Sequence, residues 1–455
     1  MAFVSINPFN GDVLTSFAGH TPDEIERALA QSARMVPIWR EAGFAPRAQL
    51  LLKLARLLRE RQGEYARLMA LEMGKPVREG RAEVQKCAWV CEFYAEHGAG
   101  MLEDEAVASD AQSSRVIYEP LGTVLGIMPW NFPFWQVLRA VAPIVMAGNT
   151  FLLKHASNVP QCALALDALF RDAGAPEGVF STLLVGSEAV PALIDDARVH
   201  GVTLTGSEAA GRKVAALAGA ALKPVVMELG GADAFLVLED ADFELALDNA
   251  VRSRFQNNGQ SCIAAKRFIV HESLAEDFAE ALAVRVAALR AGDPTDEDTE
   301  IGPLARPDLR EQVLEQVQAS VREGARVLQG GVAVAGSYAA MQACVLMDVR
   351  PGMVAFDEEI FGPVAAICVA KDDLHALHLA NASRFGLGGS VWTRDVARGE
   401  ALARGLECGA AFVNGMVKSD PRLPFGGCKV SGLGRELGVQ GLKAFTNVKT
   451  LWVGA

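Results

Sequence analysis

The spacing of hydrophobic residues changes near residue 115, which divides the chain into two kinds of pattern. Between residues 47 and 74, Leu50, Leu54 and Leu57 recur at the spacing of one helix face, which is typical of a helix packed on one side. Earlier, Thr21 precedes a proline and two acidic residues, a combination that favours a helix start. We therefore expect the first hundred residues to be mainly helical.

Beyond residue 115, short runs of β-branched and apolar residues alternate with longer stretches of helical periodicity. Strands are expected at residues 116–118 and 123–127. The expected pairs of helix and following strand are 134–147 with 150–153, 161–173 with 179–185, and 190–197 with 202–204. Because such alternation is typical of βαβ units, it predicts a parallel sheet. A similar alternation after residue 230 predicts a second α/β domain.

The composition excludes several classes of protein. With 455 residues, 51% hydrophobic and 22% charged, the chain is long enough for two or three folded domains and lacks the signature of disorder. Its 43 basic and 55 acidic residues give a net charge of −12, which repels nucleic acid and anionic lipid. We therefore expect neither a nucleic-acid partner nor a membrane partner.

The N-terminus and the cysteines indicate a cytoplasmic location. Pro8 comes too early for a secretory signal, and the longest apolar stretch, 137–153, is interrupted by Arg139. The 8 cysteines lack the spacing of a disulfide framework, which is typical of a reducing compartment. Cys87 and Cys91 lie one helical turn apart without further ligands at zinc spacing, so no metal site is expected.

Three polar residues stand at positions suited to chemistry. Cys262 lies among small and polar residues, where a thiol can meet a ligand. Glu228 ends an apolar run and precedes two glycines, at the kind of strand end where α/β folds place ligands. Prolines on both sides aim the Asn131 amide. Each also has a structural interpretation: a buried thiol, a solvated strand-end acid and a proline-bracketed turn.

One segment has the pattern of a nucleotide phosphate site. Residues 204–212 run from an expected strand through Gly206 and Ser207 into an expected helix. The free N–H groups and the dipole at a helix N-terminus suit a pyrophosphate. The segment lacks the full Gly-x-Gly-x-x-Gly pattern, and the Gly-Leu-Gly at 432–434 matches the start of that pattern without a preceding strand. We therefore interpret 432–434 as a loop.

Seven motifs, in order along the chain, resemble those of the NAD(P)-dependent aldehyde dehydrogenase superfamily. They span almost the whole chain, so the combination is far more specific than any single motif. The segment Gln260–Phe268 is further similar to bacterial succinate-semialdehyde dehydrogenases. The seven motifs are Pro129-Trp130-Asn131-Phe132-Pro133, Lys154, Gly206-Ser207, Glu228-Leu229-Gly230-Gly231, Gly259-Gln260-Ser261-Cys262, Glu358-Glu359-Ile360-Phe361-Gly362-Pro363-Val364 and Pro424-Phe425-Gly426-Gly427.

The resemblance implies that an aldehyde is oxidised to its carboxylic acid, with succinate semialdehyde as the expected substrate. Cys262 would be the nucleophile and Glu228 the general base, while the Asn131 side chain and the Cys262 backbone N–H would form an oxyanion hole. The thiolate would add to the aldehyde as a thiohemiacetal, and hydride transfer would leave a thioester. Water activated by Glu228 would then release the acid.

The resemblance also implies that the cofactor is NAD or NADP. Lys154 and Ser157 would face the adenosine ribose, and Ser207 the pyrophosphate. Ser157 stands where strongly NAD-selective members carry glutamate, so the sequence leaves the choice between the two cofactors open. The expected cofactor contacts are Ile127, Pro129, Trp130, Lys154, Ser157, Gly206, Ser207, Glu359 and Phe361.

Four residues are expected to contact the substrate: Trp135, Arg139, Gln256 and Phe425. Trp135 and Arg139 are four residues apart on one helix face, and Arg139 matches an arginine that contacts the distal carboxylate in similar enzymes. Gln256 replaces a second arginine of those enzymes. The alternative is that Arg139 pairs with an acid elsewhere. Glu436 resembles the family's second carboxylate, either as part of a proton path or in a structural ion pair.

The fold implied by the resemblance has three parts. A Rossmann-like, parallel-sheet cofactor domain would comprise residues 1–100 and 121–229, and an α/β catalytic domain would comprise 230–440. A small β oligomerisation element would comprise residues 101–120 and 441–455. An apolar terminal strand with an unpaired edge would tend to pair with a strand of another subunit. We therefore expect a homodimer or a homotetramer.

Other functions remain as alternatives. The enzyme could be a broad-range or other aliphatic aldehyde dehydrogenase. A cysteine acyltransferase or amidase would use the same thiol, carboxylate and oxyanion donors, and measured NAD(P) binding would separate it from a dehydrogenase. A non-catalytic scaffold is the third alternative. It would be favoured if the protein showed no activity that alkylation of its thiols could abolish.

Overall fold

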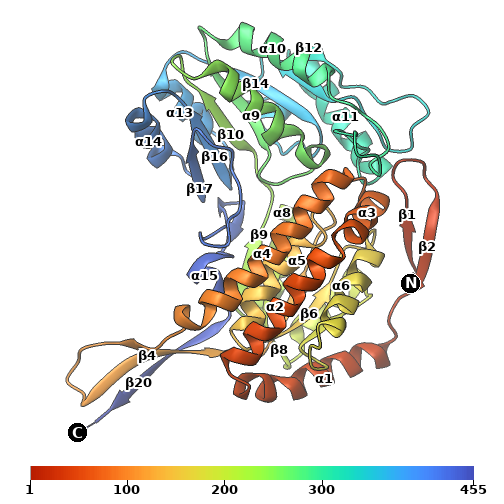
Figure 1. Cartoon of the computed structure of the whole chain (residues 1–455). Helices are drawn as coiled ribbons and strands as arrows, with labels where there is room; N and C mark the ends of the chain where they lie inside the picture. Colours follow the sequence, from red (N-terminus) through yellow and green to blue (C-terminus); the bar gives the residue numbers. More distant parts are fainter. Residues whose placement is uncertain (1, 455) are drawn as a thin grey trace.

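The computed structural model describes residues 2–454, which form two α/β lobes and a projecting arm (Figure 1). The N-terminal helices and the first sheet lie in the lower lobe of Figure 1, and the second sheet lies in the upper lobe. The predicted α/β class, with strands that alternate with helices, is confirmed.

The first sheet has the Rossmann-like strand order that creates a ligand crevice. Its order is β19-β9-β8-β5-β6-β7, with β5 paired in parallel to both β6 and β8. The chain therefore adds β6 and β7 on one side of β5 and then β8 and β9 on the other side. Such a switch point between β5 and β8 leaves a crevice outside the carboxyl ends of the strands. The strands are β5 (Thr123–Ile127), β6 (Thr150–Lys154), β7 (Phe180–Thr182), β8 (Val199–Thr205), β9 (Val225–Glu228) and β19 (Gly432–Leu433).

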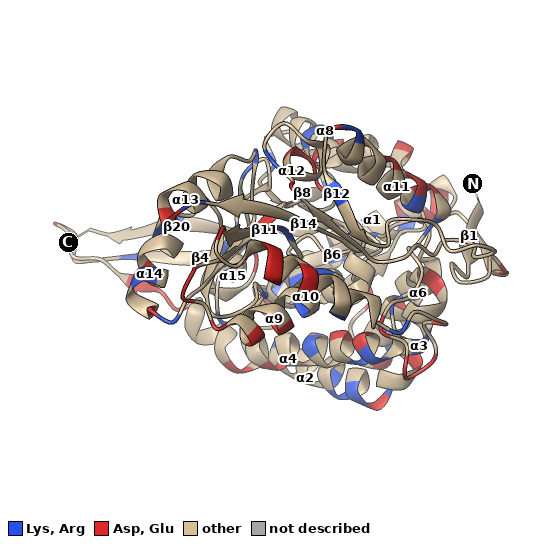
Figure 2. Cartoon of the chain, turned by 90° about the horizontal axis from the view of Figure 1, so that it is seen from above, with Lys and Arg blue, Asp and Glu red and all other residues tan. Residues whose placement is uncertain are grey.

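Helices cover this sheet, as the alternating pattern predicts. The long helix expected between residues 47 and 74 is two helices, because the backbone leaves the helical conformation at Arg61. The hairpin of β1 (Ala2–Ile6) and β2 (Val13–Ala18) was not predicted. The helices are α1 (Pro22–Glu41), α2 (Phe44–Glu60), α3 (Gln62–Met73), α4 (Val77–Met101), α5 (Trp135–Met146), α6 (Pro160–Asp172), α7 (Val190–Asp195) and α8 (Glu208–Ala220). Figure 2 shows basic and acidic residues interspersed along α2 and α3.

The second sheet has the order β12-β13-β14-β11-β10-β16-β17 and is parallel except for β12. Its strands are β10 (Asp233–Val237), β11 (Ala265–His271), β12 (Arg326–Gln329), β13 (Cys344–Met347), β14 (Val364–Ala370), β16 (Gly388–Trp392) and β17 (Ala410–Val413). Its helices are α9 (Phe243–Phe255), α10 (Ala275–Ala287), α11 (Pro307–Arg322), α12 (Val354–Asp357), α13 (Asp373–Asn381) and α14 (Val396–Gly405). A small ladder joins β15 (Phe385–Gly386) to β18 (Cys428–Lys429).

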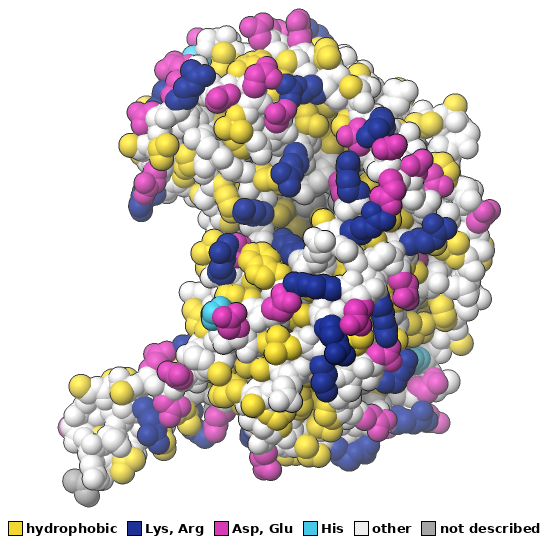
Figure 3. Space-filling model, in the orientation of Figure 1, with side chains coloured by type: hydrophobic (Ala, Val, Ile, Leu, Met, Phe, Trp, Pro, Cys, Tyr) yellow, Lys and Arg dark blue, Asp and Glu magenta, His cyan; other side chains and the backbone are white. Residues whose placement is uncertain are grey.

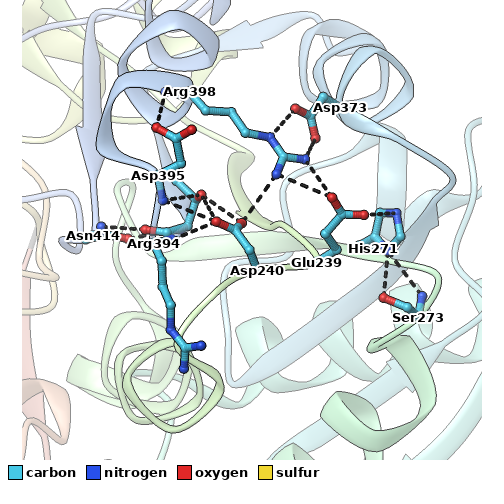
Figure 4. A network of polar contacts seen from close by, with 10 residues as sticks. Glu239, Asp240, His271, Ser273, Asp373, Arg394, Asp395, Arg398 and Asn414 are labelled. Carbon is cyan, nitrogen blue, oxygen red and sulfur yellow. Dashed lines mark hydrogen bonds and ion pairs between the residues drawn. The ribbon is translucent and has the colours of Figure 1, made fainter.

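Ion pairs occupy the carboxyl ends of the second sheet (Figure 4). Asp240, after β10, accepts hydrogen bonds from the Thr393 hydroxyl at 2.8 Å and the Asp395 backbone N–H at 3.2 Å. Arg398 of α14 reaches Asp373 at 2.6 Å and Glu239 at 3.4 Å. These contacts tie the ends of β10 and β16 to α13 and α14, so this network serves the fold.

The arm is a separate sheet of the order β20-β4-β3. It joins β3 (Glu105–Ala106) and β4 (Ser113–Pro120) to the C-terminal strand β20 (Thr446–Val453), which follows α15 (Gly438–Lys443). In Figure 1 the arm extends away from both lobes. One strand crosses the predicted domain boundaries, since β19 belongs to the segment 230–440 but pairs with β9 of the first sheet.

Candidate active site

A cavity of about 250 Å³, here called the thiol cavity, lies at the switch point of the first sheet. Asn131 and Ser207, which follow β5 and β8, line one side, and Cys262 and Glu359, which precede β11 and β14, line the other. The carboxyl ends of the first sheet thus face loops before strands of the second. The lining residues are Pro129, Trp130, Asn131, Gln136, Thr205, Gly206, Ser207, Leu229, Gly230, Cys262, Leu309, Gln312, Glu359 and Phe361.

A tightly held turn presents Cys262 to this cavity. Asn257 and Asn258, just before it, adopt left-handed backbone angles with φ of 53° and 58°, a conformation that asparagine tolerates better than most residues. The Asn257 side chain donates to the Asn131 carbonyl at 2.7 Å. Lys266 of β11 donates to the carbonyl oxygens of Ser261 at 2.9 Å and Cys262 at 2.7 Å. These bonds fix where the thiol lies relative to Asn131.

Burial and nearby charges set the acidity of the thiol. Burial raises the pKa of the Cys262 thiol from 9.0 to about 11, although Arg139 and Lys266 act to lower it. Glu359 and Asp233 raise it further. The thiolate is the nucleophilic form, so the thiol must lose its proton before it attacks.

The Asn131 amide is oriented by two side-chain bonds. Its Oδ1 accepts a hydrogen bond from Gln136 Nε2 at 3.0 Å, which directs Nδ2 to the opposite side. Nδ2 donates one proton to the Gln260 carbonyl at 3.0 Å and has a second proton to give. The Cys262 backbone N–H donates to no acceptor among residues 2–454. These two donors beside the thiol suit a developing oxyanion.

Glu228 lies in a buried cluster of charges next to the thiol cavity. Its carboxylate does not line that cavity; both oxygens are buried without hydrogen-bond partners among residues 2–454. Burial, followed by the nearby carboxylate of Glu436, raises the pKa of Glu228 well above its usual value, although Arg139 acts to lower it. Burial in this position therefore favours the protonated form of the Glu228 carboxyl group.

Two of the expected substrate residues, Arg139 and Phe425, lie in a buried cluster of charges. Arg139 is 2% exposed, forms an ion pair with Glu436 and donates to the Thr205 hydroxyl at 3.1 Å. The Phe425 ring packs against the guanidinium, with 4.8 Å between Cζ and the ring centroid. Neither residue lines the thiol cavity or the outer cavity described below. Two buried carboxylates need a cation, so Arg139 pairs with an acid, the alternative considered in the sequence analysis.

Six predicted cofactor residues line the thiol cavity: Pro129, Trp130, Gly206, Ser207, Glu359 and Phe361. The remaining three lie near the ends of β5 and β6. Ile127 and Lys154 are neighbours in the sheet, and Ser157 is exposed on the following loop.

These residues fit a dinucleotide. Ser207 caps α8, and the backbone N–H groups of Glu208 and Ala209 donate to no acceptor among residues 2–454, as a pyrophosphate site requires. A Cβ at Gly230 would lie 2.2 Å from Glu359 Oε2. Only glycine at this position therefore leaves room for the Glu359 carboxylate in the wall of the thiol cavity. Glu359 also accepts the Gly231 N–H at 3.1 Å.

A second cavity, of about 480 Å³, lies between α4, α5 and α9, and we call it the outer cavity. Trp135 and Gln256, both expected to contact substrate, line it. Figure 3 shows a hollow between the lobe of α9 and the lobe of α4, with Lys and Arg side chains gathered around it. The lining residues are Arg78, Glu79, Ala82, Glu83, Lys86, Phe132, Trp135, Arg252, Gln256 and Asn257.

Sequence reasoning missed the ion pair that holds the Asn131 loop. Glu83 of α4 forms a buried ion pair with Lys75 and accepts the backbone N–H groups of Phe134 and Trp135, each at 2.9 Å. The pair therefore anchors the start of α5, directly after Asn131. A signal was present, because Glu83 lies on the apolar face of α4 between Gly80 and Cys87, and a charge on such a face indicates a buried partner.

The fold and the site together are typical of one class of protein, an enzyme that brings a dinucleotide site and a cysteine thiol to one cavity. Comparison with known families agrees, because residues 1–451 match the aldehyde dehydrogenase family. The chain belongs to the aldehyde dehydrogenase family. It is 48% identical over 449 residues to the succinate semialdehyde dehydrogenase [NAD(P)+] of Escherichia coli (strain K12), with 99% of this chain and 97% of that protein covered.

Two further relatives are similar over their full length. A probable succinate-semialdehyde dehydrogenase [NADP(+)] of Synechocystis is 49% identical over 455 residues, with both chains covered completely. The crystal structure of succinic semialdehyde dehydrogenase from Streptococcus pyogenes, in complex with NADP+, is 33% identical and superposes with a TM-score of 0.97 over 100% of both chains. Within residues 2–454, the helices are all too short or too polar to cross a bilayer.

Proposed function

We propose that this protein oxidises succinate semialdehyde to succinate with NADP+ or NAD+. One observation carries the proposal: the Cys262 thiol, the Asn131 amide and the N-terminus of α8 at Ser207 all line a single cavity. A nucleophile, an oxyanion donor and a phosphate site are thus within reach of one bound substrate and cofactor. The names of the relatives support succinate semialdehyde as the aldehyde.

The residues of this chain have distinct tasks in the proposed reaction. The Cys262 thiol releases its proton to solvent water, and the thiolate sulfur bonds to the aldehyde carbon while the carbonyl oxygen becomes an oxyanion. The Asn131 Nδ2–H and the Cys262 backbone N–H hold that oxyanion. A bound nicotinamide would supply the acceptor for the hydride that leaves this carbon. Loss of the hydride leaves an acyl thioester on Cys262.

Release of the acid requires water and a base. Glu228 takes a proton from water as the oxygen bonds to the thioester carbon, and the carbon–sulfur bond then breaks to return the Cys262 thiolate. The carboxylate must be ionised and must rotate from its cluster towards the thiol cavity. Glu436, ion-paired with Arg139 beside Glu228, then takes the proton onward as part of a proton path.

The proposal includes both cofactors and a substrate with a distal carboxylate. Ser157 is short, uncharged and exposed, so it neither repels a 2′-phosphate nor holds two ribose hydroxyls as a carboxylate would. A broad-range aldehyde dehydrogenase would use the same thiol cavity, and the aldehyde preference separates the two. An acyltransferase or a scaffold would have no need of the phosphate site at α8.

The arm is proposed to join subunits into a homodimer or a homotetramer. β20 is the edge of its sheet, and Val448, Trp452 and Val453 are 61%, 53% and 43% exposed. An apolar edge strand is a ready surface for pairing. We keep the domain division into 1–100 with 121–229, 230–440, and 101–120 with 441–455. A catalytic thiol needs a reducing compartment, which supports a cytoplasmic location.

Initial rates test this function. Purified protein is mixed with succinate semialdehyde, butanal or acetaldehyde and either cofactor, and the absorbance of the reduced nicotinamide is followed. We expect the highest kcat/KM with succinate semialdehyde, activity with both cofactors, and none in Cys262→Ala, which still binds cofactor. A higher kcat/KM for butanal would refute the substrate, and unchanged turnover in Cys262→Ala would refute the mechanism.

A further inference from the structure

We propose that Lys86 of α4 binds the distal carboxylate of the substrate in the outer cavity and so determines the preference for a carboxylate-bearing aldehyde. The inference rests on the proposed function and assigns its carboxylate contact to a residue other than Arg139. Lys86 lines the outer cavity together with Trp135 and Gln256.

Lys86 is a half-buried cation without an anionic partner. Its ammonium donates to Ser419 Oγ at 2.7 Å and lies 4.4 Å from the centroid of the Trp135 ring. No carboxylate among residues 2–454 forms an ion pair with it. An ammonium has three protons to donate, so the hydroxyl leaves donors unused. A desolvated charge with spare donors is costly unless a ligand completes its bonds.

The acids in the outer cavity do not neutralise Lys86. The Glu83 carboxylate is taken by Lys75 and by two backbone N–H groups at the start of α5. Burial raises the pKa of Glu79 to about 7, which reduces its negative charge at neutral pH. Arg78 and Arg252, exposed among the lining residues, add positive charge. The cavity therefore attracts an anion.

The outer cavity is also close to the reacting atoms. Asn257 lines the outer cavity, and its side chain donates a hydrogen bond to the backbone carbonyl of Asn131. The wall of the outer cavity is thus in contact with the loop that carries the oxyanion donor Asn131. Arg139 lies near enough to influence the pKa of both the Cys262 thiol and the Lys86 amine. The proposal therefore has the aldehyde carbonyl at Cys262 and the other end of the substrate extending past the Asn131 loop towards Lys86.

A charge-removing variant tests the contact. Lys86→Met keeps the length of the side chain and its packing on Trp135 but removes the ammonium. The ratio of kcat/KM for succinate semialdehyde to that for butanal should fall about tenfold to a hundredfold, the range for a charge-assisted hydrogen bond. Lys86→Arg should restore part of the ratio. Lys53→Met, which removes an exposed lysine of α2, is the matched control and should leave the ratio unchanged.

Succinate inhibition separates this inference from the proposed function. Succinate and butyrate are compared as competitive inhibitors of butanal oxidation, so turnover of succinate semialdehyde is not needed. Lys86→Met should raise the inhibition constant of succinate by the same factor as above and leave that of butyrate unchanged. If wild-type protein does not oxidise succinate semialdehyde but this difference is found, the proposed substrate is wrong and the Lys86 site stands.

Two results overturn the inference. Unchanged ratios in Lys86→Met, for turnover and for inhibition, would remove Lys86 as the carboxylate contact. Equal losses for both aldehydes and both inhibitors, in Lys86→Met and in Lys86→Gln, would mean that Lys86 supports the Ser419 loop instead.

The pH dependence gives a third readout. Burial, followed by the charge of Arg139, lowers the pKa of Lys86 to about 8, while Cys87, Glu83 and Asp420 act to raise it. The positive charge is lost as the pH rises through this value, so KM for succinate semialdehyde should increase above pH 8 relative to that for butanal. A parallel change for both aldehydes would count against the inference.

Discussion

Replacement of Arg139 tests the charge cluster beside the thiol cavity. In Arg139→Met, Glu436 loses its ion pair and Glu228 loses the cation that acts to lower its pKa, while both carboxylates stay buried. Removing one partner of a buried ion pair costs about 3–5 kcal/mol. At 1.4 kcal/mol per tenfold, the lower limit corresponds to a roughly hundredfold change in the unfolding equilibrium.

An exposed ion pair supplies the matched control. Arg404 and Glu400 lie one turn apart on α14 at 2.6 Å, with side chains 77% and 60% exposed. Such pairs contribute about 0.3–0.5 kcal/mol, so Arg404→Met should barely move the unfolding midpoint. Arg139→Met/Glu436→Gln should recover part of the loss, because the double variant no longer buries the unpaired Glu436 charge.

Urea unfolding, followed by tryptophan fluorescence, measures these effects. The order of midpoints should be wild type and Arg404→Met together, then the double variant, then Arg139→Met. Activity on succinate semialdehyde and butanal should fall by the same factor in Arg139→Met. A stable Arg139→Met protein that loses only succinate semialdehyde would refute the reasoning and return Arg139 to the substrate site.

Two other results are expected from the charges near the cofactor and the thiol. Ser157→Glu should depress the use of NADP relative to NAD by charge repulsion, measured as the ratio of kcat/KM values; an unchanged ratio would place the discriminating contact elsewhere. Alkylation of Cys262 by iodoacetamide in the cofactor-free protein should speed up with pH to a midpoint near 11, because burial raises the pKa of the thiol to about 11. The same reaction with Cys262→Ala measures alkylation of the other cysteines, which is subtracted. A midpoint at or below pH 9 would contradict the raised pKa of the buried Cys262 thiol.

The sequence was sufficient for the alternating strands and helices and for most of the residues that line the thiol cavity, although not for Gln136, Leu309 and Gln312. Local periodicity predicts β5, α5 and β8, and the motifs around Asn131 and Ser207 follow strands at the carboxyl edge of the first sheet. Cys262 comes before β11 of the second sheet and meets these motifs only in the fold. Local pattern could not give the position of Arg139, because its partner Glu436 is almost 300 residues away in the chain. The residue type signals a cation, and only the tertiary fold decides which anion it meets.

The outer cavity was less accessible to sequence reasoning for the same reason. Lys86 and Arg252 come from α4 and α9, on different lobes, and meet only when the lobes are packed. Lys86 also looks like an ordinary exposed lysine of an amphipathic helix. Its lack of an ionic partner becomes visible only with the neighbours Ser419 and Trp135 in place.

The most direct test of the mechanism is the covalent state of Glu228→Gln during turnover. Glutamine keeps the shape of the side chain but cannot accept a proton from water, so deacylation should slow more than hydride transfer. The variant is mixed with succinate semialdehyde and NADP+, quenched, and analysed by intact and peptide mass spectrometry. We predict one burst of NADPH per active site and a succinyl group on Cys262. Undiminished turnover without an adduct, or an adduct on another residue, would contradict the account.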